Sequence, residues 1–191
     1  MLIKKTLKFK VIFIICNVLV CCLDASAQTV VQKLDKTSSI VRFSVDSQLM
    51  KISGRLLSYV GNLKLDKKTN TPQSVSLKLD ASEIHIDPNN NFQTISLDSL
   101  FKTIKDPVFS YESTKITQLS KNQYRVEGLL KRGKQTWNSS MTLKSVNVKN
   151  NSTECYFKEN GPIKGIDREI PFLALGGNQL TGSIESKLVF K

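Results

Sequence analysis

Histidine is the side chain that most often moves protons or binds metals near neutral pH, and this sequence has one. His85 lies in the segment Glu83-Ile84-His85-Ile86-Asp87, where strand alternation points it to the same side as the two carboxylates. A metal site would need a second histidine or a cysteine, and none is near in sequence. We therefore expect a surface histidine at a strand end and no metal ion.

Cysteine could supply a nucleophile, but the pattern around Cys155 favours a structural role. Cys155 alternates onto the same apolar side as Phe157, which is typical of a buried small hydrophobic residue. Activation of the thiol would need a basic partner, and His85 is the only histidine of the chain. A nucleophilic role is therefore not expected.

Two pairs of carboxylates could in principle work as acid and base. Asp98 and Asp106 flank a short segment with helical spacing, and Asp167 and Glu169 flank an arginine in a stretch rich in turn residues. Helix capping and surface ion pairs explain both pairs. Gly176-Gly177-Asn178 is followed by neither a lysine nor a helical pattern, so it predicts a turn and not a phosphate loop. From the sequence we expect no catalytic residue and no cofactor, and we expect that the protein is not an enzyme.

The elements that dominate the chain are strands. Apolar residues recur with period two from residue 34 onward, as in Val75, Leu77 and Leu79, which alternate with polar side chains. Between such runs lie turn signals at Lys67 to Pro72, Asp87-Pro88, Lys121-Asn122, Arg132-Gly133-Lys134, Asn160-Gly161-Pro162 and Gly176-Gly177-Asn178. Many short strands at this spacing predict an all-β sandwich or barrel.

One segment, from Ile95 to Lys105, departs from this period. Leu97, Leu100, Phe101 and Ile104 recur at helical spacing, Asp98 is a candidate N-cap, and Asp106-Pro107 would end the helix. We expect one short helix there. Its apolar face cannot join the sheet, so it either covers a barrel mouth with Leu100 and Phe101 or packs as ordinary core.

The N-terminus resembles a secretory signal peptide. Four lysines precede an apolar run from Val11 to Leu23, which ends in Ala25-Ser26-Ala27. We expect cleavage after Ala27, a mature domain of residues 28–191 and a periplasmic or secreted location. A transmembrane anchor is disfavoured because the run is shorter than the roughly 20 residues that span a bilayer. A lipoprotein anchored at Cys22 is the other alternative.

Removal of that segment changes both the cysteine content and the charge. Of the four cysteines only Cys155 remains, so the mature chain cannot form an internal disulfide. Four lysines and Asp24 also leave, which lowers the formal net charge from +12 to about +9. The remaining lysines are spread along the chain without interleaved aromatic residues, so we expect no nucleic-acid partner. A weak attraction to anionic envelope surfaces stays open.

The order and spacing of these motifs resemble the YceI-like family of bacterial polyisoprenoid-binding proteins. The resemblance runs from residue 34 to residue 191 and is carried by Leu34-Asp35, Ser39 to Val45, Gly54 to Asp66, Ser74 to Ser82, Leu100-Phe101, Pro107 to Ile116 and Tyr124 to Leu129. It implies an eight-stranded antiparallel, lipocalin-like barrel that holds a long isoprenoid or fatty chain. Ser38 and Ser47 stand where family members often carry histidines, so no contact to a ligand head group is carried over.

A closed barrel of about eight strands either fills its interior with side chains or leaves room for one ligand. We therefore expect a periplasmic carrier or reservoir of a polyisoprenoid, quinone-like molecule or fatty chain, and keep a ligand-free structural or interaction module of the cell envelope as the alternative. The inward apolar candidates for contact with the ligand are Phe43, Val45, Leu63, Leu77, Leu79, Leu100, Phe101, Phe109, Tyr111, Val126, Met141 and Leu143.

Overall fold

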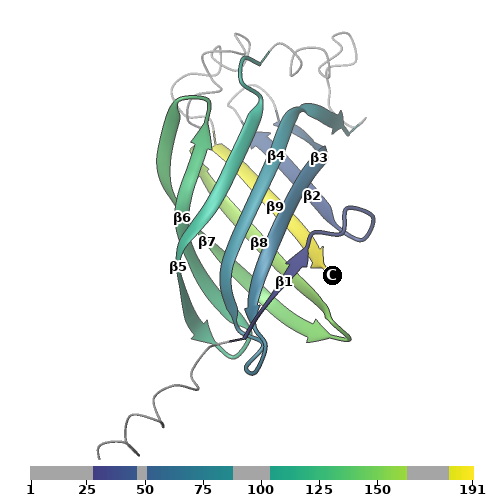
Figure 1. The fold of residues 1–191 in the computed structure, drawn as a ribbon. Helices are drawn as coiled ribbons and strands as arrows, with labels where there is room; N and C mark the ends of the chain where they lie inside the picture. Colours follow the sequence, from purple (N-terminus) through teal and green to yellow (C-terminus); the bar gives the residue numbers. More distant parts are fainter. Residues whose placement is uncertain (1–27, 47–50, 88–103, 163–180) are drawn as a thin grey trace, which may run out of the picture.

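The computed structural model describes residues 28–46, 51–87, 104–162 and 181–191. Strands account for most of these residues and form one antiparallel sheet (Figure 1). They are β1 (Thr29–Lys33), β2 (Ile40–Asp46), β3 (Lys51–Asp66), β4 (Pro72–Ile86), β5 (Val108–Ser120), β6 (Gln123–Arg132), β7 (Gln135–Lys149), β8 (Ser152–Pro162) and β9 (Thr181–Phe190). Within these ranges no helix has the length and apolar character needed to cross a membrane.

The sheet closes into a barrel because β3 is paired along both of its edges. The strand order is β1-β3-β2-β9-β8-β7-β6-β5-β4, and an additional β3–β4 pairing joins the ends. On the other edge of β3, β1 pairs with residues 62–66 and β2 with residues 51–56, so β1 and β2 share one position. The predicted all-β, eight-stranded antiparallel barrel is thus confirmed, with one position filled by two short strands. Closure pairs the edges that an open sheet would leave exposed.

The interruption between β1 and β2 is held by Asp35. Its carboxylate accepts hydrogen bonds from the Thr37 amide (3.0 Å), the Thr37 hydroxyl (2.6 Å) and the Ser38 hydroxyl (2.8 Å), and it forms an ion pair with Lys191. The Lys191 ammonium, followed by these hydroxyl groups, holds the pKa of Asp35 well below its ordinary value. A short polar turn therefore links two strands at one barrel position.

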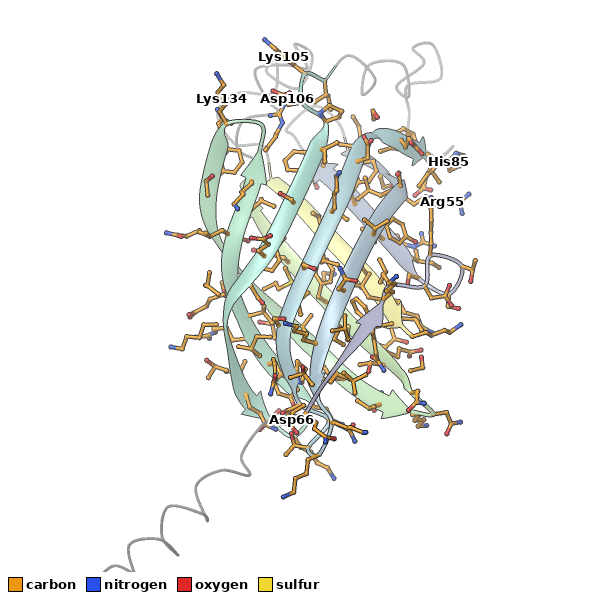
Figure 2. The ribbon with its side chains drawn as sticks, in the orientation of Figure 1. Arg55, Asp66, His85, Lys105, Asp106 and Lys134 are labelled. Carbon is orange, nitrogen blue, oxygen red and sulfur yellow. The ribbon has the colours of Figure 1, made fainter. Side chains whose placement is uncertain are left out.

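The two ends of the barrel differ in the turns they carry (Figure 2). The lower end holds the β3–β4 turn beside Asp66, and the upper end holds the β6–β7 turn beside Lys134. Asn70, Asn122 and Gly133 take positive φ angles of 56°, 136° and 53° in the β3–β4, β5–β6 and β6–β7 turns. These three turns confirm the predictions from the sequence, since Asn and Gly tolerate this backbone region best.

The turn predicted at Asn160-Gly161-Pro162 is wrong. Strand β8 continues through Pro162, and these three residues pair with Ser183, Gly182 and Thr181 of β9. Pro162 is the last residue of the strand, so its missing backbone N–H does not interrupt the middle of the ladder. The predicted helix from Ile95 to Lys105 falls outside the described residues up to Thr103, while Ile104 and Lys105 are not helical. The helix therefore stays a prediction.

Candidate ligand-binding interior

The register of the strands determines which side chains face the barrel interior. Directly paired residues of antiparallel strands lie on the same face, so the inward set can be followed around the barrel from pair to pair. Leu77 pairs with Gly61 and Tyr111, Tyr111 with Leu130, and Leu130 with Trp137. Alternation along each strand then gives the remaining inward positions.

The lower part of the interior is filled by a hydrophobic core. Its most deeply buried members come from β2, β3, β6, β7, β8 and β9 and are Val41, Leu63, Val126, Leu143, Cys155, Leu188 and Phe190. They belong to one continuous cluster of contacting side chains. This end of the barrel therefore has a solid interior, as the filled-barrel alternative requires.

Above this core, one group of inward residues keeps part of its surface accessible, while Val45, Ile52 and Ile84 nearer the upper end are buried. Each of the eight strand positions contributes one such residue, and we call the set the upper layer: Phe43, Leu56, Leu79, Phe109, Leu130, Trp137, Glu159 and Ile184. Ile184 is 36% exposed although its partners Phe43 and Glu159 place it on the inner face. An apolar side chain that faces inward and yet remains accessible is a candidate contact for a ligand.

The candidate residues from the sequence divide between these two levels. Leu63, Leu77, Tyr111, Val126, Met141 and Leu143 are buried in the core, and Val45 is buried outside that cluster, nearer the upper end than Phe43. Phe43, Leu79 and Phe109 lie in the upper layer and are half-buried. Leu100 and Phe101 lie outside the described residues. All the described candidates thus face inward, but several of them build the core beneath the upper layer.

Five upper-layer residues were missed as candidate contacts by sequence reasoning: Leu56, Leu130, Trp137, Glu159 and Ile184. A signal existed for Trp137, because it continues the alternation of Met141 and Leu143 along β7. Glu159 continues the inward series of Cys155 and Phe157 on β8 in the same way. A charged residue at the end of an apolar series reads as outward, however, so the hydrophobic pattern alone could not assign it.

Two charged residues occupy inward strand positions in the described part of the chain, Arg132 and Glu159. The Arg132 guanidinium is buried near the upper end, where Nε donates to the Asp106 carbonyl (3.1 Å) and Nη2 to the Lys105 carbonyl (2.6 Å). It also lies 5.5 Å from the centre of the Phe109 ring. Arg132 therefore fastens the segment before β5, whose Lys105 and Asp106 are labelled in Figure 2, to the end of β6.

Glu159 lies in a less polar setting. Burial raises the pKa of its carboxyl group above the ordinary value. Its charge also acts on Tyr111, whose pKa is raised to about 12, first by burial and then by Glu159 and Glu127. Tyr111 donates its hydroxyl to the Val126 carbonyl at 3.0 Å. The Glu159 carboxylate thus lies in the barrel interior, and its charge affects the ionisation of Tyr111.

The residues considered for catalysis that the structure describes, His85, Cys155 and Asp106, are not brought together. His85 is exposed on β4, opposite Arg55 in the β3–β4 register and on the outer face (Figure 2). Cys155 is 1% exposed, and burial, with a smaller effect of Glu154, raises its pKa to about 12. Asp106 is exposed, whereas Asp98, Asp167 and Glu169 lie outside the described residues. Among the described residues no three metal-ligating side chains gather.

Comparisons with known proteins agree with this architecture. A family model described as YceI-like domain matches residues 32–173. The structure of BcnA from Burkholderia cenocepacia aligns with a TM-score of 0.58 at 15% identity, covering 82% of this chain and 98% of that one. A polyisoprenoid binding domain from Saccharophagus degradans aligns with a TM-score of 0.52 at 11% identity, covering 84% and 97%. No curated protein sequence matches the chain.

Proposed function

This chain belongs to the YceI-like family, and on that premise we propose that its barrel binds a long apolar molecule in the upper layer, as a carrier or reservoir. The ligand classes are a polyisoprenoid, a quinone-like molecule or a fatty chain. The observation that carries the proposal is the accessibility of inward apolar residues, above all Ile184. The relative from Saccharophagus degradans supports it, since it is named as a polyisoprenoid binding domain.

The physical basis is the hydrophobic effect. Each CH₂ group transferred from water into an apolar site contributes about 0.8 kcal/mol. A chain of several isoprene units can therefore bind without a charged anchor, although association and ordering offset part of this gain. Phe43, Phe109 and Trp137 offer flat apolar surfaces for such a chain.

Export and the absence of catalysis are also parts of the proposal. The charged and apolar succession before Ala25-Ser26-Ala27 supports cleavage after Ala27 and a periplasmic or secreted barrel. The outward position of His85 and the raised pKa of Cys155 support a binding protein over an enzyme. N-terminal sequencing of the exported protein tests the first point, and a mature N-terminus at lipidated Cys22 would contradict it.

The chain contains its own probe for ligand binding, because its single tryptophan, Trp137, lies in the upper layer. Delipidated protein titrated with geranylgeraniol should show a saturable change in tryptophan fluorescence at micromolar concentration. Ile184→Asp should weaken this binding at least tenfold, since it places a charge on the proposed contact surface. Val60→Asp is the matched control, because Val60 is exposed on the outer face of β3.

Protein purified from its own host provides the second test. Native mass spectrometry and a lipid extract should reveal a bound apolar chain in wild type and a reduced load in Ile184→Asp. An empty host-purified protein together with an unresponsive Trp137 would contradict the proposal. That result would favour the ligand-free envelope module, with which the solid lower half of the barrel is compatible.

A further inference from the structure

An unpaired hydroxyl group lies at the boundary between the packed core and the upper layer. Ser186 on β9 pairs with Phe157 on one side and Val41 on the other, so it faces the interior between two apolar residues. The residue is 3% exposed, and its Oγ atom has no hydrogen-bond partner in the structure. A buried hydroxyl without a partner is costly, so each case in a folded protein calls for an explanation, and a partner from outside the polypeptide is one of them.

The nearest polar inward position on the neighbouring strand β8 is Glu159, since the residue directly opposite Ser186 is Phe157 and the other diagonal neighbour is Cys155. Phe157 faces Ser186 and Glu159 faces Ile184, so Glu159 and Ser186 are diagonal neighbours on the same face. Diagonal pairs in an antiparallel sheet lie roughly 7–8 Å apart at Cα, within reach of one small polar group held between their side chains. In the part of the chain that the structure describes, no hydrogen bond or ion pair engages the Glu159 carboxylate.

The other polar groups nearby are already committed to protein partners. Tyr111 donates its hydroxyl to the Val126 carbonyl, and Arg132 donates to the carbonyls of Lys105 and Asp106. At this level of β8 and β9 an accepting carboxylate and a hydroxyl that can accept or donate are left open, whereas the other unpaired hydroxyl of β8, that of Thr153, lies at the lower end of the barrel opposite Phe190. This set matches the hydroxyl group of an alcohol, which can donate to Glu159 and accept from Ser186.

We propose that Glu159 and Ser186 bind the head group of the ligand and select an apolar chain that ends in an alcohol over the same chain ending in a phosphate or carboxylate. The inference rests on the proposed function, because it requires an apolar chain in the upper layer. An anionic head group would stand beside the Glu159 carboxylate in surroundings of low polarity, where like charges repel strongly. The apolar tail would then lie along Ile184 and Phe43, the next residues toward the upper end.

The test compares two probes that differ only in the head group and, beside them, a longer hydrocarbon that has no head group. Geranylgeraniol and geranylgeranyl phosphate are titrated into delipidated protein with Trp137 fluorescence as the signal, and squalene serves as a chain without a head group. Wild type should bind the alcohol about tenfold more tightly than the phosphate, the range expected from one good hydrogen bond to a charged group. Squalene should bind with similar affinity to wild type and to the variants Glu159→Gln and Ser186→Ala.

Two substitutions test whether Glu159 and Ser186 select the alcohol head group. Glu159→Gln should narrow the preference for the alcohol to about threefold or less, since it removes the charge that repels the phosphate. Ser186→Ala should weaken the alcohol several-fold without lowering the melting temperature, because it deletes a hydroxyl that has no partner in the protein. The matched controls are Glu185→Gln and Ser140→Ala, which alter an exposed carboxylate and an exposed hydroxyl.

The outcomes separate this inference from the proposed function. Equal binding of alcohol and phosphate, or a preference that survives in Glu159→Gln, would overturn the head-group assignment while leaving apolar binding intact. A Ser186→Ala variant that loses stability and keeps full affinity for the alcohol would show Ser186 to be purely structural. Failure of squalene and geranylgeraniol alike to bind wild type would reject the proposed function and this inference with it.

Discussion

The ring of Tyr111 on β5 occupies the space above Gly128 on β6. A Cβ atom built at residue 128 would come within 2.6 Å of Tyr111 Cζ and 2.4 Å of the Glu112 carbonyl oxygen. Ser113 pairs with Gly128, so the tyrosine reaches across from the next inward position of β5 and donates its hydroxyl to the Val126 carbonyl. The absence of a side chain at residue 128 is therefore what lets the Tyr111 ring come close to the β6 backbone.

Gly128→Ala should consequently destabilise the barrel by about 1–3 kcal/mol, the usual cost of overpacking a core. The backbone carbonyl of Glu112 cannot move aside cheaply, so the added methyl group must displace both the β5–β6 pairing and the Tyr111 ring. Urea unfolding followed by circular dichroism measures the change. Gln123→Ala, at an exposed position of the same strand, is the control and should leave the midpoint nearly unchanged.

Strand β4 offers a test of the inward and outward assignment. Leu77→Asp should unfold the barrel or prevent its accumulation, because it places an unpaired carboxylate in the core beside Gly61 and Tyr111. Lys78→Asp, one residue further on the exposed side, should be nearly silent. Thermal melting of the two variants checks the prediction, and equal melting temperatures would show that the register of β4 is wrong.

The alternation that predicted these faces was readable in the sequence because each strand has one apolar and one polar side. Val41, Phe43 and Val45 on β2, and Val75, Leu77 and Leu79 on β4, all face inward as expected. The residues follow a local period, and local periods do not depend on which strands become neighbours. The inward apolar set was therefore largely predictable from the amino-acid pattern.

Pairing between distant strands was not predictable from the pattern. The sharing of one barrel position by β1 and β2 depends on Asp35, whose ionic partner Lys191 lies at the other end of the sequence. Glu159 was missed because a hydrophobic pattern assigns charged residues to the outer face, whereas closure of the barrel places this one inside. The family resemblance implied a barrel of eight strands. The inward position of Glu159 became evident only from the strand register.

Cys155 should not react with thiol reagents while the protein is folded. Its side chain is buried, and burial raises its pKa to about 12, so the reactive thiolate is scarce at neutral pH. In the chain from Gln28 onward, maleimide should label Cys155 only in denaturant, at a rate set by unfolding of the barrel. Ser140→Cys provides an exposed thiol for comparison. Rapid labelling of native Cys155 would mean that the β8–β9 part of the core opens locally.

The Asp35 turn should make stability depend on pH in the acid range. The Lys191 ammonium and the hydroxyls of Thr37 and Ser38 lower the pKa of Asp35 in the folded state, so the unfolded chain binds its proton at a higher pH than the folded one. The stabilisation is then complete above the unfolded-state pKa of about 3.9 and is lost as pH falls through the folded-state pKa.

Asp35→Asn should therefore melt below wild type at pH 6, and the difference in melting temperature should shrink steadily between pH 4 and pH 2. Asp46→Asn, at an exposed position of β2, should cost less at pH 6. A difference that stays constant down to pH 2 would show that Asp35 acts through its shape and hydrogen bonds, which asparagine partly replaces, and not through its charge.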